Sequence, residues 1–370
     1  MTGRWRLLAD DGVGAAEGLA LDEALMARYA RGEPDRPPTL RLYSYASHCA
    51  LVGRYQNLEA DIDLEACRRT GTEVSRRLTG GGAIIMGSGQ LGVAYMDRAP
   101  VGKRPRETIE ELSGALVVGL AQFGVKAAFH GKNDLEVGGR KIAGLGLYLD
   151  PAGAMLFHAS VLADLDVGFM LEVLRIPAAK LEGTAAAAVT ERITTVSAET
   201  GTKCDATRIR PAIAAGFAAN FGVVLEPGSP DGSEQARAEA LSAGRYRSQA
   251  WLDEHSVSED GSGSALLKTP AGLARVYLAT HGDLVKTALV VGDFNDLPPE
   301  LVAMESALKW RRLDEPTVAG VVASTSVAEA LGLPADRIVA ALLEAGRLAG
   351  NTTPSEQAPA QAAGGEPEAG

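Results

Sequence analysis

The chain has 370 residues and a formal net charge of −11 at pH 7, with 46% hydrophobic and 22% charged residues. This length exceeds the usual size of one domain, so two domains are expected, each with a core of its own. The negative charge argues against nucleic acid as a main partner, because neutralising phosphates requires a basic surface.

The first residues carry arginines and acids without a long apolar run, so the sequence predicts neither a secretory signal nor a membrane-spanning helix. The three cysteines, Cys49, Cys67 and Cys204, have no C-x-x-C spacing. This argues against a disulfide framework and against a structural zinc site. Together these features predict a cytoplasmic protein without a membrane partner.

Hydrophobic spacing predicts an amphipathic helix over residues 18–30, in which Asp22 and Glu23 are interpreted as first-turn acids that favour the helix dipole. Strands are expected at residues 39–45 and 49–53, and a short helix at 64–70. A strand over residues 73–78 then leads into three glycines, followed by paired strands at 84–86 and 91–96.

A long helix is expected over residues 107–123, because leucine and isoleucine recur along one stripe. Short strands follow at 125–129, 135–137, 141–149 and 155–162, and then helices at 167–174, 196–200 and 206–221. Strict β-α-β alternation is absent. We therefore expect an α+β fold with a mixed, mainly antiparallel sheet flanked by helices, which gather on one side of it.

Residues 227–233, PGSPDGS, have the composition of a linker. Beyond them the sequence predicts a helix at 233–243, strands at 273–279 and 284–291, and helices at 299–308, 317–331 and 335–345. The expected organisation is a first domain over residues 1–226, a linker over 227–235, a small second α+β domain over 236–347 and a disordered tail over 348–370.

Three consecutive glycines stand between the charged strand that ends in Arg76 and Arg77 and an apolar strand that begins at Ile84. Glycine permits a turn in which the backbone can approach a ligand without obstruction by a Cβ atom. Exposed amides in such a turn form an anion-binding concavity, and the two arginines would add charge at its rim. A tight turn without a ligand is the alternative explanation.

A second motif, K-N-D-L-E-V-G-G-R-K-I-A-G, runs over residues 132–144. In this order, the two motifs resemble those of the lipoate-protein ligase A family, R-R-x-[ST]-G-G-G-A and N-D-L-x-V-x-G-[RK]-K-[IV]-x-G, which build one active site. Residues 20–24 and 53–57 also match patterns of this family. The resemblance implies a biotin/lipoate ligase catalytic fold with a C-terminal lipoate ligase accessory domain.

The resemblance further implies ATP-dependent, Mg²⁺-dependent activation of lipoate, or a similar medium-chain acid, to an acyl-adenylate. The acyl group would then pass to a lysine of a lipoyl domain or an H-protein. Adenylation brings negative charge to negative charge, so catalysis needs cations and preorganised donors. Lys141 is the catalytic candidate, and Asp134 is the best candidate to hold the metal or to orient Lys141.

The resemblance also implies a set of residues that bind the acid or ATP. An Asx turn is the alternative role for Asn133 and Asp134, and a core position is the alternative for His158. The expected binding residues are Arg77, Thr79, Gly80, Gly81, Gly82, Ala83, Ile84, Ile85, Gln90, Asn133, Asp134, Gly144, His158 and Ser160.

The chain departs from the family pattern at several positions, which leaves the acid and full ligase activity open. One alternative is an octanoyl or lipoyl transferase of the same fold, which forms a thioester on a cysteine just ahead of the lysine-bearing strand. No cysteine lies between Cys67 and Cys204, so that route has no nucleophile there. A non-catalytic acyl-carrier-binding paralogue is a further alternative. Biotin ligation is disfavoured, because this chain lacks the arginine-rich loop of biotin ligases. The departures are Met86, Gly87, Leu145, Gly146, Phe157 and Ala159.

Overall fold

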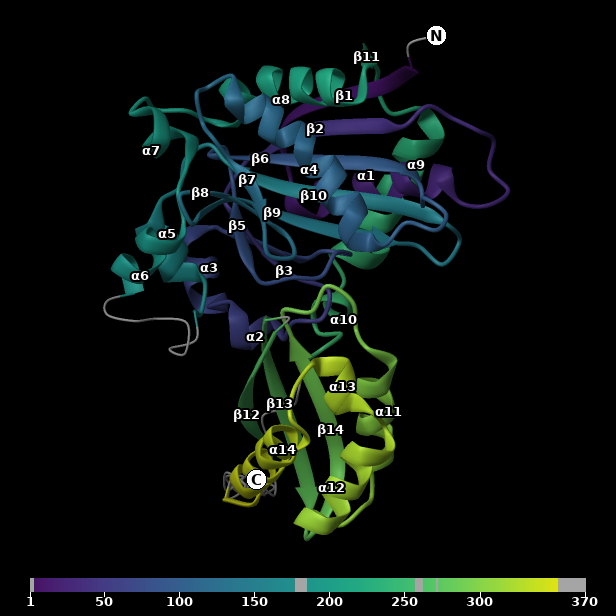
Figure 1. Cartoon of the computed structure of the whole chain (residues 1–370), viewed down its shortest axis with the longest axis vertical. Helices are drawn as coiled ribbons and strands as arrows, with labels where there is room; N and C mark the ends of the chain where they lie inside the picture. Colours follow the sequence, from purple (N-terminus) through teal and green to yellow (C-terminus); the bar gives the residue numbers. More distant parts are fainter. Residues whose placement is uncertain (1–2, 177–184, 257–261, 271, 352–370) are drawn as a thin grey trace, which may run out of the picture. The chain divides into compact units, whose positions relative to one another are not determined.

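The computed structural model describes residues 3–176, 185–256, 262–270 and 272–351 (Figure 1). The chain divides into two compact units. The larger comprises Met1–Ser256 together with Val291–Leu297, and the smaller comprises Val257–Val290 and Pro298–Gly370. Among the described residues, no helix is both long and apolar enough to cross a membrane.

An eight-stranded sheet runs through the larger unit in the order β11-β1-β2-β6-β10-β9-β8-β7 (Figure 1). The strand β1 pairs in parallel with β11 and β2, and the other neighbouring pairs are antiparallel. The mixed, mainly antiparallel sheet of the α+β prediction is confirmed. The strands are β1 (Gly3–Val13), β2 (Thr39–Tyr45), β6 (Gln90–Arg98), β7 (Ala128–His130), β8 (Asp134–Val137), β9 (Arg140–Leu149), β10 (Ala154–Leu162) and β11 (Val223–Pro227).

Helices cover both faces of this sheet, which corrects the expectation that they gather on one side. Leu42 of β2 packs in the core shared with α4 (Pro105–Ala121) and α8 (Ala206–Phe221). Tyr43, the next residue, packs on the opposite face with α1 (Ala15–Met26). The sequence of β2, TLRLYSY, alternates polar and apolar residues as a strand with one solvent-exposed face does, yet both of its faces are buried, so the alternation gave no sign of the second layer. On the side of the sheet that α1 covers, α1 also contacts the helical segments η1 (Ala27–Tyr29), α9 (Gly232–Leu241) and η3 (Ser242–Tyr246). The short helix α10 (Gln249–Leu252) follows η3 in the chain.

A second, three-stranded sheet has the order β4-β3-β5 and carries the glycine segment between two of its strands. Its central strand β3 (Cys49–Val52) pairs in parallel with β4 (Glu73–Arg76) and antiparallel with β5 (Ile84–Met86). Short helices pack a separate hydrophobic cluster against it. The short helices of this unit are α2 (Leu58–Asp61), α3 (Leu64–Thr70), α5 (Val167–Val173), α6 (Ala185–Arg192) and α7 (Val196–Thr200).

The segment predicted as a linker over residues 227–235 lies inside the larger unit, which continues to Ser256. Asp231 accepts hydrogen bonds from the amides of Ser233 and Glu234 and so caps α9. The buried Glu234 side chain pairs with Arg6 and Arg28. Proline, glycine and serine are common both in tight turns, as here, and in linkers between domains. Composition alone could not tell the two apart, so the predicted boundary at residue 226 came too early.

In the described part of the smaller unit, one sheet has the order β12-β13-β14 and is accompanied by four helices. The predicted pair of strands is present, but β12 was missed. The helix predicted over residues 317–331 is two helices, separated at Ser326, whose φ is 55°. The last helix passes residue 347, and the rest of the predicted tail, residues 352–370, lies outside the described residues. The elements are β12 (Ser262–Thr269), β13 (Gly272–His281), β14 (Leu284–Gly292), α11 (Pro299–Leu308), α12 (Glu315–Ser324), α13 (Val327–Leu331) and α14 (Ala335–Asn351).

The helices α4 and α8 cross where Gly216 faces Gly119, so Gly216→Ala should destabilise the larger unit. A Cβ atom at residue 216 would lie 2.6 Å from the backbone nitrogen of Gly119. Overpacking of this kind lowers the free energy of unfolding by about 1–3 kcal/mol. Chemical denaturation measures the change. The control is Gly232→Ala on α9, where a Cβ atom meets nothing within 4 Å, and equal stability of the two variants would contradict the crossing argument.

Candidate active site

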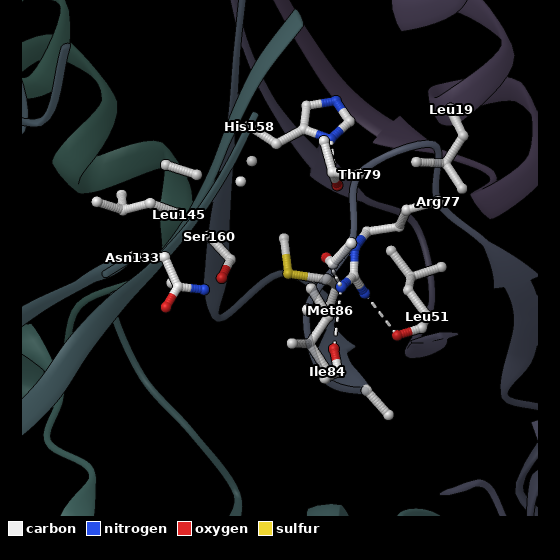
Figure 2. Close-up of a pocket in the computed structure, with 18 of the residues that line it drawn as sticks. Leu19, Leu51, Arg77, Thr79, Ile84, Met86, Asn133, Leu145, His158 and Ser160 are labelled. Carbon is white, nitrogen blue, oxygen red and sulfur yellow. Dashed lines mark hydrogen bonds between the residues drawn. The ribbon is translucent and has the colours of Figure 1, made fainter. Parts of the chain in front are cut away.

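One cavity of the larger unit brings the two sequence motifs together (Figure 2). The glycine turn and β5 form one wall, and β9 and β10 form another. Helix α1 and the strand β2 supply Leu19, Tyr43 and Tyr45. The residues that line it are Leu19, Tyr43, Tyr45, Leu51, Arg77, Thr79, Gly80, Gly81, Gly82, Ala83, Ile84, Met86, Gly92, Asn133, Lys141, Gly144, Leu145, Gly146, His158, Ala159 and Ser160.

Most of the predicted binding residues line this cavity, with three exceptions. Ile85 packs in the cluster below the smaller sheet. Gln90 lies outside the lining, and its amide nitrogen donates to the carbonyl oxygen of Asp164 at 2.6 Å. Asp134 does not line the cavity itself but contacts Lys141. The other predicted positions remain candidates for binding the acid or ATP.

A β-bulge directs Lys141 towards the cavity. The pairing of β8 with β9 shifts register between Leu135 and Glu136, which leaves Ile142 as an extra residue on β9. Ile142 and Ala143 are both buried in the core on the α4 and α8 side. The extra residue lets Lys141 and Gly144 line the same cavity, although a regular strand would place positions three apart on opposite faces.

The Lys141 ammonium forms an ion pair with Asp134. Its Nζ lies 2.7 Å from Asp134 Oδ1, and the two side chains are 35% and 31% exposed. A Cβ atom at Gly144 would lie 3.0 Å from Lys141 Nζ, so glycine there leaves room for the ammonium. The arrangement presents a partly solvated cation with a fixed position at the cavity wall.

The Arg77 side chain holds the glycine turn closed from within. Its guanidinium donates to the carbonyl oxygens of Leu51 at 2.7 Å, Gly82 at 2.9 Å and Gly80 at 3.2 Å (Figure 2). Burial lowers the pKa of Arg77 to about 10. The group is still charged at pH 7, and three carbonyl acceptors compensate for its loss of water.

Two other donors that the sequence placed at the rim of an anion site are also bonded to the protein. Arg76 is fully buried and donates to the carbonyl oxygens of Gln56 at 2.7 Å and Trp251 at 3.0 Å, among others. The amide of Gly81 donates to the carbonyl oxygen of Phe294 at 2.9 Å. In this conformation, these groups stabilise the turn rather than face an anion.

Asp22 was misassigned by the sequence, because it is neither exposed nor in the first turn of its helix. It is fully buried in α1, whose first-turn acid is Glu17. Its Oδ1 accepts from Arg41 at 2.7 Å, and its Oδ2 accepts from the Tyr43 hydroxyl at 2.9 Å and lies 3.0 Å from His158 Nε2. Although burial raises the pKa of Asp22, Arg41 and His158 outweigh that effect and hold it below the usual range. Its neighbour Glu23 is also buried and accepts from the Tyr246 hydroxyl at 2.8 Å.

Four of the six departures from the family pattern line the cavity, namely Met86, Leu145, Gly146 and Ala159. Phe157 instead packs in the core, and a Cβ atom at Gly87 would meet His48. The apolar lining residues Leu19, Leu51 and Tyr45 were missed, since an apolar residue in a strand or helix carries no signal that separates a cavity from a core.

The described residues contain no group of three or more histidine, cysteine, aspartate or glutamate side chains that could hold a metal ion. Mg²⁺ is commonly held by one or two carboxylates together with the phosphates of its substrate. Asp134 alone would fit such a role, in competition with its ion pair to Lys141.

Comparison with known proteins shows which family the chain belongs to. Residues 14–218 match the model of the lipoyl protein ligase A/B catalytic domain. An octanoyltransferase of Symbiobacterium thermophilum is 32% identical over 280 residues, covering 68% of this chain and 98% of the relative. A bipartite lipoate protein ligase from Thermoplasma acidophilum, described with its E2 lipoyl domain, has a TM-score of 0.61 and 25% identity, covering 70% of this chain and 99% of that one. A lipoate-protein ligase A bound with ATP shares the fold, with a TM-score of 0.58 and 24% identity, covering 68% and 98% of the two chains.

Arg76→Lys should destabilise the larger unit, because one ammonium cannot reach the several carbonyls that the guanidinium binds. Buried carbonyls that lose a charged donor cost about 1–3 kcal/mol each, so a fall of roughly 2–4 kcal/mol in the free energy of unfolding is expected. Denaturant unfolding at pH 7 gives the value. The control Arg69→Lys changes an arginine whose side chain is 63% exposed and should shift stability by less than about 0.5 kcal/mol. Equal shifts would contradict the structural role of Arg76.

Proposed function

Because the chain belongs to the lipoyl protein ligase A/B family, we propose that it activates lipoate or a similar medium-chain acid with ATP and transfers the acyl group to a protein lysine. The chain is an enzyme of the lipoate ligase and transferase family. The observation that carries the ligase proposal is the Lys141–Asp134 pair at the wall of a cavity that holds no cysteine among its lining residues.

Adenylation requires a carboxylate oxygen to attack the α-phosphate of ATP while pyrophosphate leaves. The Lys141 ammonium reduces the repulsion between the two anions, and Asp134 fixes its position. ATP supplies the adenylyl group, and Mg²⁺ would be held by its phosphates and Asp134. The ATP bound by the structural relative supports this choice of co-substrate. Met86 and Leu145 would contact the apolar part of the acid.

An octanoyltransferase is the second candidate, and the similarity to the Symbiobacterium thermophilum enzyme favours it. Transfer through a thioester needs a cysteine that can ionise. All three cysteines of this chain are described and buried, and none lines the cavity. Burial raises the pKa of Cys67 to about 11 and that of Cys49 well above its usual value. The structure therefore favours activation without a cysteine thioester.

A lipoyl domain or an H-protein would supply the acceptor lysine. The Thermoplasma acidophilum ligase is described with an E2 lipoyl domain, which supports an acceptor of this kind. The non-catalytic alternative would have no use for a paired lysine at the cavity, so the Lys141–Asp134 contact weighs against it.

Lys141→Ala should lower lipoate-dependent pyrophosphate release by about 100-fold, because the transition state loses its positioned cation. The assay uses the full chain with ATP, Mg²⁺ and either lipoate or octanoate. Lys132→Ala is the matched control, since Lys132 is exposed and does not line the cavity. Unchanged release in Lys141→Ala would remove the catalytic assignment.

An assay without ATP distinguishes the ligase from the transferase. Transfer from an octanoyl thioester to a lipoyl domain without ATP, and no pyrophosphate release with free acids, would overturn the ligase proposal in favour of the transferase. A variant with all three cysteines replaced by alanine then tests whether that transfer needs a thiol.

A further inference from the structure

Three side chains from separate elements form a hydrogen-bonded line that ends at the cavity. Asp22 Oδ2 lies 3.0 Å from His158 Nε2, and His158 Nδ1 lies 3.4 Å from Thr79 Oγ1 (Figure 2). Asp22 belongs to α1, His158 to β10 and Thr79 to the segment before the glycines. Both His158 and Thr79 line the cavity, so the line connects a buried carboxylate to the place where an acyl group would react.

The partners of Asp22 determine which imidazole nitrogen carries the hydrogen. The Asp22 carboxylate already accepts from Arg41 and Tyr43, and as an anion it only accepts. The hydrogen of the neutral imidazole therefore sits on Nε2, which faces Asp22, and Nδ1 is left as an acceptor. The Thr79 hydroxyl can donate to Nδ1 and at the same time accept a hydrogen bond from a group in the cavity.

Transfer of the acyl group to a protein lysine requires a group that accepts a proton from that lysine. A lysine has a pKa of about 10.4 and is an ammonium at neutral pH, so it must lose a proton before its nitrogen can attack a carbonyl carbon. We propose that Thr79 takes this proton from the acceptor lysine while passing its own hydroxyl proton to His158 Nδ1, with Asp22 and Arg41 holding the imidazole in place.

The step balances without a further reagent. The freed amine forms the new C–N bond, and the bond from the acyl carbon to its leaving group breaks. The leaving group departs with the bonding electrons as AMP, or as a thiolate if the donor is a thioester. One proton moves from the ammonium to the Thr79 oxygen and one from Thr79 to His158, from which it passes to water. The nitrogen loses its second proton as the adduct collapses to the amide, and this proton passes to the leaving group or to water. The inference rests on the proposed transfer to lysine and holds for either acyl donor.

Lys141 is a poorer choice for this base, because it is paired with Asp134 at 2.7 Å and already serves as the cation of the proposed activation step. The groups around His158 keep their charge near neutral pH. Asp22 stays ionised, and burial raises the pKa of both Tyr43 and Tyr45 above their usual value, so both remain neutral. Of the charged and titratable groups nearby, Asp22 on α1 contacts the imidazole, and Arg41 and Tyr43 on β2 bond to Asp22. Tyr45 on β2, Arg77 beside the glycine turn and Lys141 on β9 line the same cavity as His158.

The test compares two acceptors of the same acyl group in the full chain. One is a lipoyl domain, whose lysine must be deprotonated, and the other is hydroxylamine, whose amine is already neutral at pH 7. Thr79→Val and His158→Gln should slow transfer to the lipoyl domain at pH 7 by about 10²- to 10³-fold, as expected for loss of general base catalysis. Transfer to hydroxylamine should change only a few-fold. Raising the pH should restore part of the lysine rate, and Thr79→Ser should retain activity.

His48→Gln is the control, because this exposed histidine stacks on Phe169 and does not line the cavity. Equal losses with both acceptors would overturn the base assignment and leave the line with a structural role. A rate for the lipoyl domain that does not recover with pH would count against it in the same way. If the unmodified chain forms the hydroxamate but never acylates a lipoyl domain, the proposed acceptor is wrong and the relay has no substrate. If it forms neither product, acyl activation itself fails.

Discussion

Buried guanidinium groups hold the irregular backbone around the cavity. Arg77 gathers three carbonyl oxygens around the glycine turn, and Arg76 does the same for the loop after β3 and for α10. Arg41 donates hydrogen bonds to the Asp22 carboxylate and to the carbonyl oxygen of Gly18. A buried cation without such acceptors would be strongly destabilising, so each arginine fixes the backbone that surrounds it. Hydrogen bonds within the protein therefore hold the walls of the cavity.

The sequence predicted those parts of the site whose signal is local. A glycine triplet between strands predicts a turn from the local sequence, and Gly81 shows why, since its φ of 89° is one that L side chains rarely adopt. Lys141 was singled out because it stands in a motif that resembles one of the lipoate-protein ligase A family, whereas a lone lysine on a strand carries no such signal. The bulge that directs it to the cavity was not predicted, because a register shift depends on the partner strand.

Features that depend on distant partners escaped prediction. Asp22 looks like a helix-terminal acid until Arg41 and His158 are brought next to it by β2 and β10. The strand β1 carries charged residues and lacks apolar alternation, yet it pairs with β2 and β11 on its two edges. The boundary of the larger unit failed for the same reason, as Glu234 acquires its structural role only from Arg6 and Arg28. Each of these features depends on a contact between two segments that are far apart in the sequence, so neither segment alone predicts it.

In the proposed reaction, the cavity would separate two chemical roles that one residue could not fill. Stabilising the meeting of two anions requires a cation, and Lys141, which is paired with Asp134, would supply it in the proposed first step. Accepting a proton from an incoming ammonium requires a site that begins unprotonated, and His158 Nδ1 offers one because Asp22 binds the other nitrogen. If Lys141 supplied the base, it would have to lose the charge that the first step needs. Placing the cation on β9 and the acceptor on β10 and the glycine segment lets both steps proceed in one cavity at one pH.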